Sequence, residues 1–476
     1  MAETIHVDSE VQVRGQYDVV VAGGGLPGVC AAVAASRAGA DVALIERDGN
    51  LGGQAAGVYT FGLDGFIDRE GCYYATGIPW EILLRTVAEG QSDPLWQSVD
   101  YERMARTGLV GELQRFEVDS ELLANQAYLN PNALRYVLFQ VLEEQQVSVF
   151  LETPLSGVLT QGSRINGIIA SANYTPFALK SSVVVDTTPH AGVAALAGHR
   201  FAYPQAYTGT HPRVAGVNIS GLLEYVEANP EDVNLRLTDQ ANTKRLEALV
   251  RDGFALLMSG FGQCRAEAIE EDPHYSATGN GDPPHLSFFY DRDGCGTYWL
   301  ASDRVRRTVV DDPGELSLAI AHLRKLQWLT HKLFRGFVPG FERAHLMDTH
   351  PHIARALVIS KEPGGFTEFD IPWEHMEQGG QYYEDSVARV MGHPNAGQSA
   401  RGFQVPYRAL LPKGLEGLIV TGKPACRFFH YHGTNATVGQ AAGAIAAVAA
   451  REHVALRRLE VAKVQQELQK QGAVVF

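Results

Sequence analysis

The amino-terminal part of the chain alternates between short apolar runs and stretches of glycine or small residues. Residues 17–22 form a valine-rich apolar run, and residues 41–45 form a second one. Both are typical of strands that are buried on two faces. Residues 26–38, between them, are mostly small and predict a helix. The pattern therefore predicts a strand, a helix and a second strand in this order.

The carboxyl-terminal part has the same character, whereas the middle of the chain differs from both. Residues 418–422 predict a buried strand, and residues 436–450 predict a helix of small residues packed close to it. The late elements are expected to complete the lobe that the early elements begin, around a differently built inserted segment. In that segment residues 242–257 and 315–334 predict helices, and residues 283–290 and 296–300 predict aromatic strands. Residues 459–471 predict a peripheral amphipathic helix.

Length and composition narrow the class of protein. A chain of 476 residues is too long for one hydrophobic core, so two or more lobes are expected. The net charge of −14 disfavours nucleic acid and anionic membranes as partners. No apolar stretch is long enough for a membrane span or a secretory signal, so we expect a soluble, cytoplasmic protein. The five cysteines are far apart and suggest neither a disulfide framework nor a metal site.

Three glycines follow the first predicted strand directly and suggest a ligand. Gly23 permits a tight turn, Gly25 lets the backbone approach a pyrophosphate, and Gly28 lets the helix pack closely on the sheet. Glu46 ends the second strand, 18 positions after Gly28 (46 − 28 = 18), where an acidic side chain accepts hydrogen bonds from a ribose. Strand, glycines, helix, strand and acid together predict a dinucleotide site without a 2′-phosphate. Leu26, Pro27 and Arg47 complete this part of the predicted site.

A second glycine pair makes the prediction more specific. Gly52, Gly53 and Gln54 come soon after Glu46. The chain here resembles the FAD-dependent oxidoreductases of the two-dinucleotide-binding-domain flavoproteins, in which such a pair lies along bound FAD. The likeness extends to Gly77-Ile-Pro-Trp-Glu-Ile, Asn130-Pro-Asn-Ala-Leu, Val183-Val-Val-Asp-Thr, Ala194-Ala-Leu-Ala-Gly, Glu384-Asp-Ser, Val405-Pro-Tyr-Arg and Gly439-Gln-Ala-Ala-Gly.

The resemblance covers roughly the first 200 and the last 95 residues. It implies an α/β fold with a Rossmann-like FAD-binding domain, discontinuous in sequence, and an inserted α+β substrate domain. The expected division is 1–199 and 405–476 for the FAD-binding domain and 200–404 for the substrate domain. One departure is the turn after the strand at 183–186, which keeps Thr187 but lacks the acidic residues usual there.

The resemblance also suggests which late residues contact the flavin. Backbone N–H groups of Thr434, Asn435 and Ala436 are expected to stabilise negative charge on the ring at the start of a helix. Gly422 and Gln440 are expected at the same site, with Thr187.

Two histidines lie directly before that helix. His430 and His432 are two apart, so an extended segment turns both the same way. Either could take a proton as a hydride leaves the neighbouring carbon, and His432 is preferred because it is nearer the helix. The alternative is that both histidines only bond backbone or FAD, and a covalent link from one of them to FAD also stays open.

A second pair, His350 and His352, has the same spacing, and with Arg355 and Tyr298 it forms the candidate substrate-binding set. The alternatives are an ordinary polar surface for the histidines and a core position for Tyr298. A metal site would need a third ligand that the sequence does not identify.

These observations favour an FAD-dependent oxidase or dehydrogenase. It would remove a hydride from a C–H next to oxygen or nitrogen of a small polar substrate, passing electrons to oxygen or an external acceptor. No second nucleotide-binding unit for NAD(P)H is visible. The alternatives are a carbon–carbon dehydrogenase or reductase, a non-catalytic electron-transfer flavoprotein subunit, and an NAD-binding sensor without flavin. Association into a homo-oligomer stays open.

Overall fold

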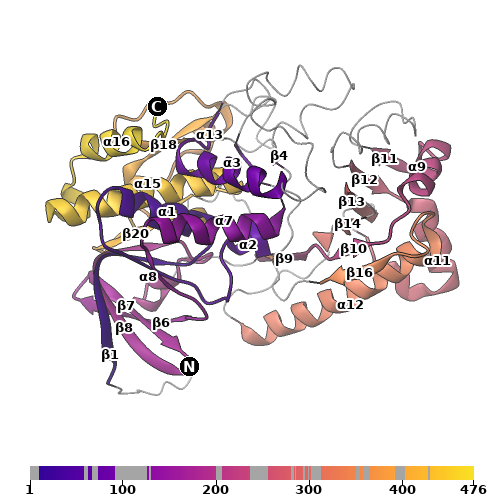
Figure 1. Cartoon of the computed structure of the whole chain (residues 1–476), viewed down its shortest axis with the longest axis horizontal. Coiled ribbons are helices and arrows are strands. Elements are labelled where there is room, and N and C mark those ends of the chain that lie inside the picture. The colour runs from indigo at the N-terminus through magenta and orange to yellow at the C-terminus, as the bar shows by residue number, and fades with distance from the viewer. Residues whose placement is uncertain are drawn as a thin grey trace.

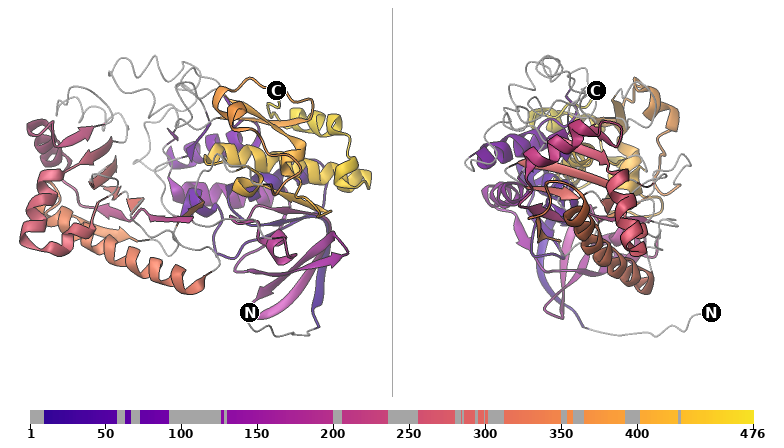
Figure 2. Two further views of the ribbon diagram at one scale, coloured as in Figure 1. Left: turned by 180° about the vertical axis from the view of Figure 1, so that it is seen from behind. Right: turned by 90° about the vertical axis from the view of Figure 1, so that its right-hand side faces the viewer.

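The protein has two lobes built around two large sheets (Figure 1). The computed structural model describes residues 10–57, 63–66, 73–91, 126–127, 130–199, 206–235, 256–279, 284, 286–292, 295–298, 300–301, 312–349, 354–357, 365–391, 402–426 and 429–476. The first lobe holds both ends of the described chain, and the second lobe lies beside it (Figure 2).

The first lobe is centred on a seven-stranded sheet with strand order β5-β2-β1-β8-β7-β6, and β20 pairs with β8. Strands β5, β2, β1, β8 and β20 are parallel, and β6 and β7 are antiparallel to their neighbours. The bounds are β1 Gln12–Ala22, β2 Val42–Ile45, β5 Ser148–Phe150, β6 Leu155–Gln161, β7 Arg164–Ala172, β8 Thr175–Asp186 and β20 Leu418–Val420. Because β20 comes from the far end of the chain, the predicted discontinuous Rossmann-like sheet is confirmed.

The register of the sheet brings four strand ends to one edge. Ala22 lies opposite both Ile45 and Asp186, and Asp186 lies opposite Val420. Ligands of open parallel sheets bind beyond such carboxyl ends. The glycine-rich loop, the acidic strand end and the late strand therefore meet at one edge.

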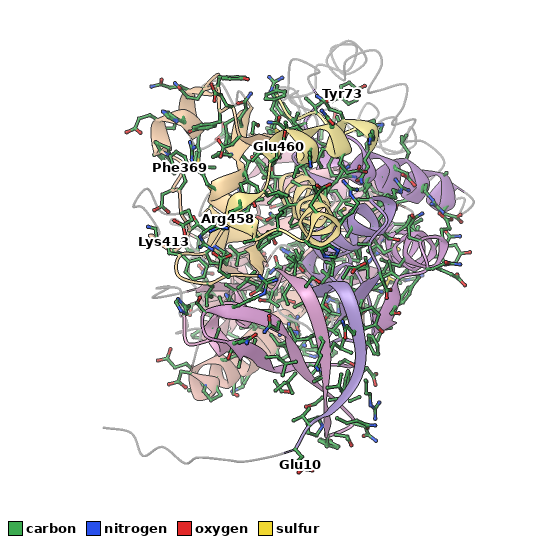
Figure 3. All side chains as sticks on the ribbon, turned by 90° about the vertical axis from the view of Figure 1, so that its left-hand side faces the viewer. Glu10, Tyr73, Phe369, Lys413, Arg458 and Glu460 are labelled. Carbon is green, nitrogen blue, oxygen red and sulfur yellow. The ribbon has the colours of Figure 1, made fainter. Side chains whose placement is uncertain are left out.

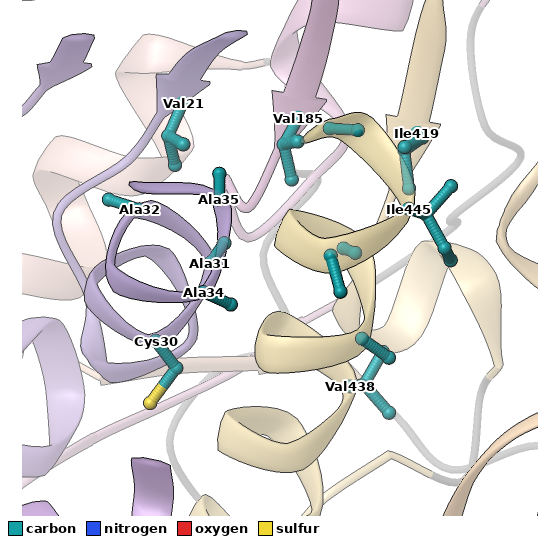
Figure 4. Packing of buried hydrophobic residues seen from close by; sticks show 14 of the residues in the cluster. Val21, Cys30, Ala31, Ala32, Ala34, Ala35, Val185, Ile419, Val438 and Ile445 are labelled. Atoms are coloured by element: carbon teal, nitrogen blue, oxygen red, sulfur yellow. The ribbon is translucent and has the colours of Figure 1, made fainter. Parts of the chain in front are cut away.

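Helices α1 (Leu26–Arg37) and α15 (His432–Glu452) pack side by side against this sheet (Figure 4). Their contact depends on glycine, because a Cβ at Gly439 would lie 2.2 Å from the Pro27 carbonyl oxygen. A Cβ at Gly443 would lie 2.0 Å from that of Ala31. The small residues predicted a helix over 436–450, and the structure begins α15 four residues earlier. The start at His432 matters for the site described below.

The Gly443 contact supports a stability prediction. Gly443→Ala is expected to lower the free energy of unfolding by about 3 kcal/mol, because the new methyl group overlaps backbone that cannot move without parting the two helices. Gly336→Ala is the control: no described atom lies within 4 Å of its Cβ position. This change should raise the free energy by roughly 0.5–1 kcal/mol, as alanine does inside helices. Urea unfolding of both variants tests this, and equal stabilities would contradict it.

Other elements of the first lobe cover the sheet and the ends of α15. Phe369, Lys413 and Arg458 lie on one side of this lobe, and Glu10 lies just before β1 at its far tip (Figure 3). The bounds are α2 Gly53–Gly57, α3 Ile78–Gln91, α7 Pro131–Glu144, α8 Gly192–Leu196, α13 Trp373–Gln378, α14 Gly422–Ala425, α16 Val461–Lys470, β3 Leu63–Asp64, β4 Gln126–Ala127, β18 Ser386–Val390 and β19 Phe403–Pro406.

The second lobe contains a six-stranded sheet in the order β11-β12-β13-β14-β10-β16, with every described pairing antiparallel. Helix α12 (Pro313–Phe337) packs against this lobe through its carboxyl-terminal part, and its amino-terminal end points toward the first lobe (Figure 1). The remaining bounds are α9 Ile219–Ala228, α11 Gly262–Glu271, β10 Arg213–Ala215, β11 Val233–Leu235, β12 Leu256–Gly260, β13 Leu286–Arg292, β14 Cys295–Tyr298 and β16 His345–Asp348. A small sheet joins β9 (Ala206–Thr210) to β15 (Leu300–Ala301) and β17 (Ala354–Leu357).

The predictions for the second lobe are partly corrected. The helix expected over 315–334 is α12, and the aromatic strands are β13 and β14. The helix expected over 242–257 is wrong at its end, because Leu256 and Leu257 pair with Tyr290 and Phe289 in the sheet. Residues 242–255 lie outside the described chain. Cross-strand pairing overrides the local helical pattern at those two leucines. The division at 199 and 405 stays a prediction.

Among the described residues, no helix is both long enough and apolar enough to span a membrane.

Candidate functional site

Thr187 holds the glycine-rich loop between β1 and α1 through hydrogen bonds of its hydroxyl group. The Thr187 hydroxyl donates to the carbonyl oxygens of Ala22 (3.0 Å) and Gly23 (2.9 Å). Gly23 has φ +107°, a conformation that glycine adopts most readily, and a Cβ at Gly28 would lie 1.8 Å from the Gly23 oxygen. Thr187, predicted as a cofactor ligand, therefore supports the loop in this structure.

Gly25 differs from the other two glycines because its outer side is open. The nearest described atom to a Cβ at Gly25 is Pro27 Cδ at 3.6 Å. The second glycine pair lies directly against this loop, since the Gly52 N–H donates to the Gly24 oxygen at 2.8 Å. A Cβ at Gly53 would lie 3.2 Å from the Gly25 Cα. Gly53 is exposed here, as is Gln54 next to it.

The open side of Gly25 faces the first turn of α1, which no described side chain caps. The first N–H groups of a helix lack intrahelical partners and attract anions, and Pro27 fixes the helical backbone there. The loop thus fits a pyrophosphate.

Glu46 lies at the end of β2 and is tied to the same loop. Its carboxylate accepts hydrogen bonds from the N–H groups of Gly24 (2.6 Å) and Asp48 (3.0 Å). Burial raises the pKa of Glu46, although the two N–H groups act in the opposite direction. A carboxylate has about four acceptor positions, so two bonds leave capacity for ribose hydroxyls. The Arg47 side chain is half-exposed and lies 3.7 Å from the Asp48 carboxylate.

The start of α15 lies at the same edge. Tyr431 is the N-cap, and no described side chain caps the helix. A Cβ at Gly422, the first residue of α14 after β20, would lie 3.6 Å from Asn435 Oδ1. A Cβ at Gly433 would lie 2.5 Å from the Gly65 oxygen, so backbone packs on backbone at this helix start. The first turn of α15 therefore lies between the end of β20 and Gly65, and the same helix reaches the glycine loop further along, at Gly439.

Comparison with known families agrees with this geometry. The model of the family described as FAD dependent oxidoreductase matches residues 18–355 and 375–468. The chain belongs to this family. It is accordingly an enzyme whose cofactor is FAD, and the resemblance drawn from its motifs is confirmed.

Solved structures with a similar fold have low sequence identity. A geranylgeranyl bacteriochlorophyll reductase-like protein from Thermoplasma acidophilum is 12% identical, with a TM-score of 0.45, and the match covers 96% of this chain and 84% of that one. The L-proline dehydrogenase from P. horikoshii is 12% identical, with a TM-score of 0.41, over 97% and 99%. The myxobacterial chondrochloren halogenase CndH is 11% identical, with a TM-score of 0.42, over 96% and 79%. No curated protein sequence matches the chain.

The helix boundary changes which N–H groups of this oxidoreductase face a ligand. Because α15 begins at His432, the N–H of Asn435 already bonds the Tyr431 oxygen at 3.0 Å. The prediction for the N–H groups of Asn435 and Ala436 is therefore wrong, and the first-turn groups belong to residues 432–434. Thr434 remains among them.

Gln440 joins two helices of the first lobe. It is fully buried, and its Oε1 accepts a hydrogen bond from the Ile78 N–H at 3.2 Å, so it connects α15 to α3. Its Nε2 is buried without a described hydrogen-bond partner. Its contact with the cofactor therefore stays a prediction.

The two candidate histidines differ in their setting. His430 is exposed, whereas His432 is partly buried as the first residue of α15. Tyr431 between them is extended, with φ −72° and ψ 149°. His432 is thus part of the first turn of α15, whereas His430 lies before the helix.

The predicted substrate residues do not form one described group. Tyr298 is fully buried, its ring lies 4.7 Å from that of Phe334, and its hydroxyl lies 3.0 Å from His331 Nδ1. Tyr298 is therefore a core residue of the second lobe, and its assignment to the substrate site is wrong. His350 and His352 lie outside the described residues, and Arg355 lies in β17 opposite Thr208. Among the described residues no group of three or more His, Cys, Asp or Glu could hold a metal ion.

Lys423 is a buried lysine next to the site residue Gly422, and sequence reasoning did not predict its burial. It follows Gly422 in α14, and only 9% of its surface is exposed. Burial lowers the pKa of Lys423 to about 8. A lysine in a glycine- and proline-rich stretch is typical of an exposed loop, so the local sequence does not predict its burial.

Asp186 ends β8 and organises the loop that follows. Its carboxylate accepts hydrogen bonds from the N–H groups of Thr188 (3.0 Å) and Val193 (2.8 Å) and from the Thr188 hydroxyl (2.7 Å). Burial nevertheless raises the pKa of Asp186 from 3.8 to about 6. Between pH 3.8 and about 6, the folded protein therefore keeps a proton on Asp186, whereas the unfolded chain releases it.

This shift predicts a pH-dependent stability. The Asp186 contribution is fully present below pH 3.8 and is lost as the pH rises through about 6. Asp186→Asn removes the titration. Between pH 4 and pH 7 the wild type should lose about 2–3 kcal/mol of unfolding free energy relative to this variant. Unfolding of both proteins at the two pH values measures the difference, and parallel profiles would refute it.

Proposed function

We propose that the protein is an oxidase or dehydrogenase that removes a hydride from a C–H next to oxygen or nitrogen of a small polar substrate. Electrons then pass to oxygen or to an external acceptor. The observation that carries the proposal is the position of His432, the first residue of α15. The same helix contacts Pro27 of the glycine loop through Gly439 and lies beside Gly422 at its start. A titratable side chain thus stands at the start of the helix that packs on the nucleotide loop.

The residues that hold the cofactor divide into two groups. The adenosine and pyrophosphate end is held by Gly25, Gly53 and Glu46. The loop that carries Gly25 is itself supported by Gly23, Gly28 and Thr187. The first turn of α15 and Gly422 hold the ring end, where N–H groups favour negative charge. FAD, when bound, supplies a ring that accepts a hydride.

His432 performs the proton transfer in this proposal. One imidazole nitrogen accepts the proton from the hydroxyl or ammonium group of the substrate as the hydride leaves the adjacent carbon. Histidine suits this step because its ordinary pKa lies close to neutral pH. The exposed His430 is left outside the transfer.

An anaerobic substrate screen tests the proposal. The purified holoenzyme is mixed with small alcohols, hydroxy acids, amines and amino acids, and loss of the visible flavin absorption is recorded for each. Bleaching with formation of a carbonyl or imine product supports the proposal. Bleaching only by substrates that gain or lose a carbon–carbon double bond, or only after a partner protein is added, contradicts it.

A further inference from the structure

Arg389 on β18 is an arginine whose guanidinium has no carboxylate partner among the described residues. Its Cζ lies over the Tyr74 ring, 5.3 Å from the ring centre, and its side chain is partly buried. Two other arginines of the first lobe, by contrast, are paired: Arg37 lies 2.8 Å from Glu81, and Arg457 lies 2.6 Å from both Glu368 and Glu416. Arg389 therefore keeps its bidentate hydrogen-bonding edge for another group.

Tyr74 holds the guanidinium in place. The Tyr74 ring is 2% exposed, and its hydroxyl accepts a hydrogen bond from the Gly402 N–H at 3.0 Å. A Cβ at Gly402 would lie 1.8 Å from a Tyr74 ring atom, so the backbone of the β18–β19 hairpin lies directly against the ring. Stacking on a fixed aromatic ring orients an arginine and lowers the entropy lost when it binds a ligand.

The same ring connects Arg389 to the candidate site. Tyr74, Met391 and Tyr431 form a small apolar cluster, and Tyr431 is the N-cap of α15. The Thr434 hydroxyl lies 3.5 Å from the Met391 oxygen, within the first turn of that helix. Met391 follows Arg389 by two residues, so both lie on the same side of the extended chain. The Tyr74 ring thus contacts the guanidinium and belongs to the cluster that contains the N-cap of α15.

We infer that Arg389 binds the carboxylate of the substrate. The substrate class is then small hydroxy acids or amino acids, in which the oxidised carbon carries the hydroxyl or amino group and lies next to the carboxylate. The inference rests on the proposed function, because it names the substrate of that same site. Arginine recognises a carboxylate through two parallel hydrogen bonds, which fix orientation as well as charge.

Binding of simple carboxylates to the oxidised holoenzyme tests the inference without turnover. The probes are acetate, propionate and benzoate, which carry no hydroxyl or amino group to oxidise; each is compared with its uncharged amide, and the readout is the change in the visible flavin spectrum. The wild type should bind the carboxylates about 100-fold more tightly than the amides. Arg389→Met should abolish this preference, and Arg389→Lys should retain only part of it because lysine lacks the fork.

Arg408→Met is the matched control. Arg408 also lies over an aromatic ring, 4.4 Å from the centre of Phe369, but it pairs with Asp385 at 3.4 Å. Its loss should leave carboxylate affinity unchanged. FAD content and thermal unfolding of each variant show whether it is folded. Equal binding of acids and amides, or a preference that survives in folded Arg389→Met, would overturn the inference.

The two proposals fail separately. Bleaching by amines or alcohols that carry no carboxylate, with no carboxylate preference, removes Arg389 from substrate binding and leaves hydride transfer standing. Carboxylate binding that depends on Arg389, with bleaching only by carbon–carbon substrates, removes the proposed reaction and keeps the carboxylate site.

Discussion

Replacing His432 with alanine is expected to slow flavin reduction by substrate roughly 100- to 10,000-fold, the range associated with loss of a general base. FAD should stay bound, because the contacts of the glycine loop and Glu46 do not involve this side chain. Stopped-flow measurement of flavin absorption after anaerobic mixing gives the rate directly.

His430→Ala provides the matched comparison. His430 is exposed and precedes the helix, whereas His432 is its first residue. Reduction by His430→Ala should stay within a few fold of the wild type. The pH profile separates proton transfer from positioning: a general base makes wild-type reduction faster as the pH rises, and His432→Ala should lose that dependence. An unchanged rate in His432→Ala, or a larger loss in His430→Ala, would remove His432 from the role.

Replacing Gly25 with valine is expected to weaken FAD binding by roughly 100-fold or more while the chain stays folded. Gly25 has φ −63° and ψ 170°, which any residue adopts, and no described atom lies within 3.5 Å of its Cβ position. The valine side chain therefore occupies the space predicted for the pyrophosphate. It blocks hydrogen bonds from backbone N–H groups to this charged ligand. Fluorescence titration of the apoprotein with FAD measures the affinity.

Gly28→Ala should behave differently from Gly25→Val. Its new methyl group would lie 1.8 Å from the Gly23 oxygen, inside the packed loop, so the variant should lose stability as well as FAD. Thermal unfolding of the two apoproteins distinguishes a blocked ligand site from a damaged fold. Full FAD affinity in Gly25→Val would show that the pyrophosphate does not lie on this loop.

The nucleotide-binding half of the fold could be predicted because its signals are local. Strand β1, the three glycines and helix α1 are consecutive, and their order dictates a tight turn with a helix start beside it. Glu46 was placed correctly at a strand end for the same reason. The open side of Gly25 and the crowded side of Gly28 agree with the roles that their spacing suggests.

Residues whose role depends on a distant segment could not be placed in this way. The resemblance of Gly439-Gln-Ala-Ala-Gly implies that Gln440 contacts the cofactor, but it does not predict that the Gln440 Oε1 accepts a hydrogen bond from Ile78, 362 positions away. Tyr298 was a candidate for the substrate, yet Phe288, Phe334 and Phe341 enclose it. Burial of one side chain is decided by all the elements that pack around it, and sequence spacing does not record them.

The sequence by itself determined the dinucleotide loop, the acidic strand end and the discontinuous α/β sheet, because each follows from short-range order: which residues are apolar, which are glycine, and how far apart they stand. The resemblance of its motifs to a known family indicated the family and the cofactor. The tertiary structure alone decided where α15 begins, and hence which N–H groups and which histidine stand at the ring end of the site. The tertiary structure also decided that Arg389 lies over the Tyr74 ring and that Lys423, next to Gly422, is buried. These positions depend on contacts between segments that are hundreds of residues apart, and such contacts exist only once the two ends of the chain share one sheet.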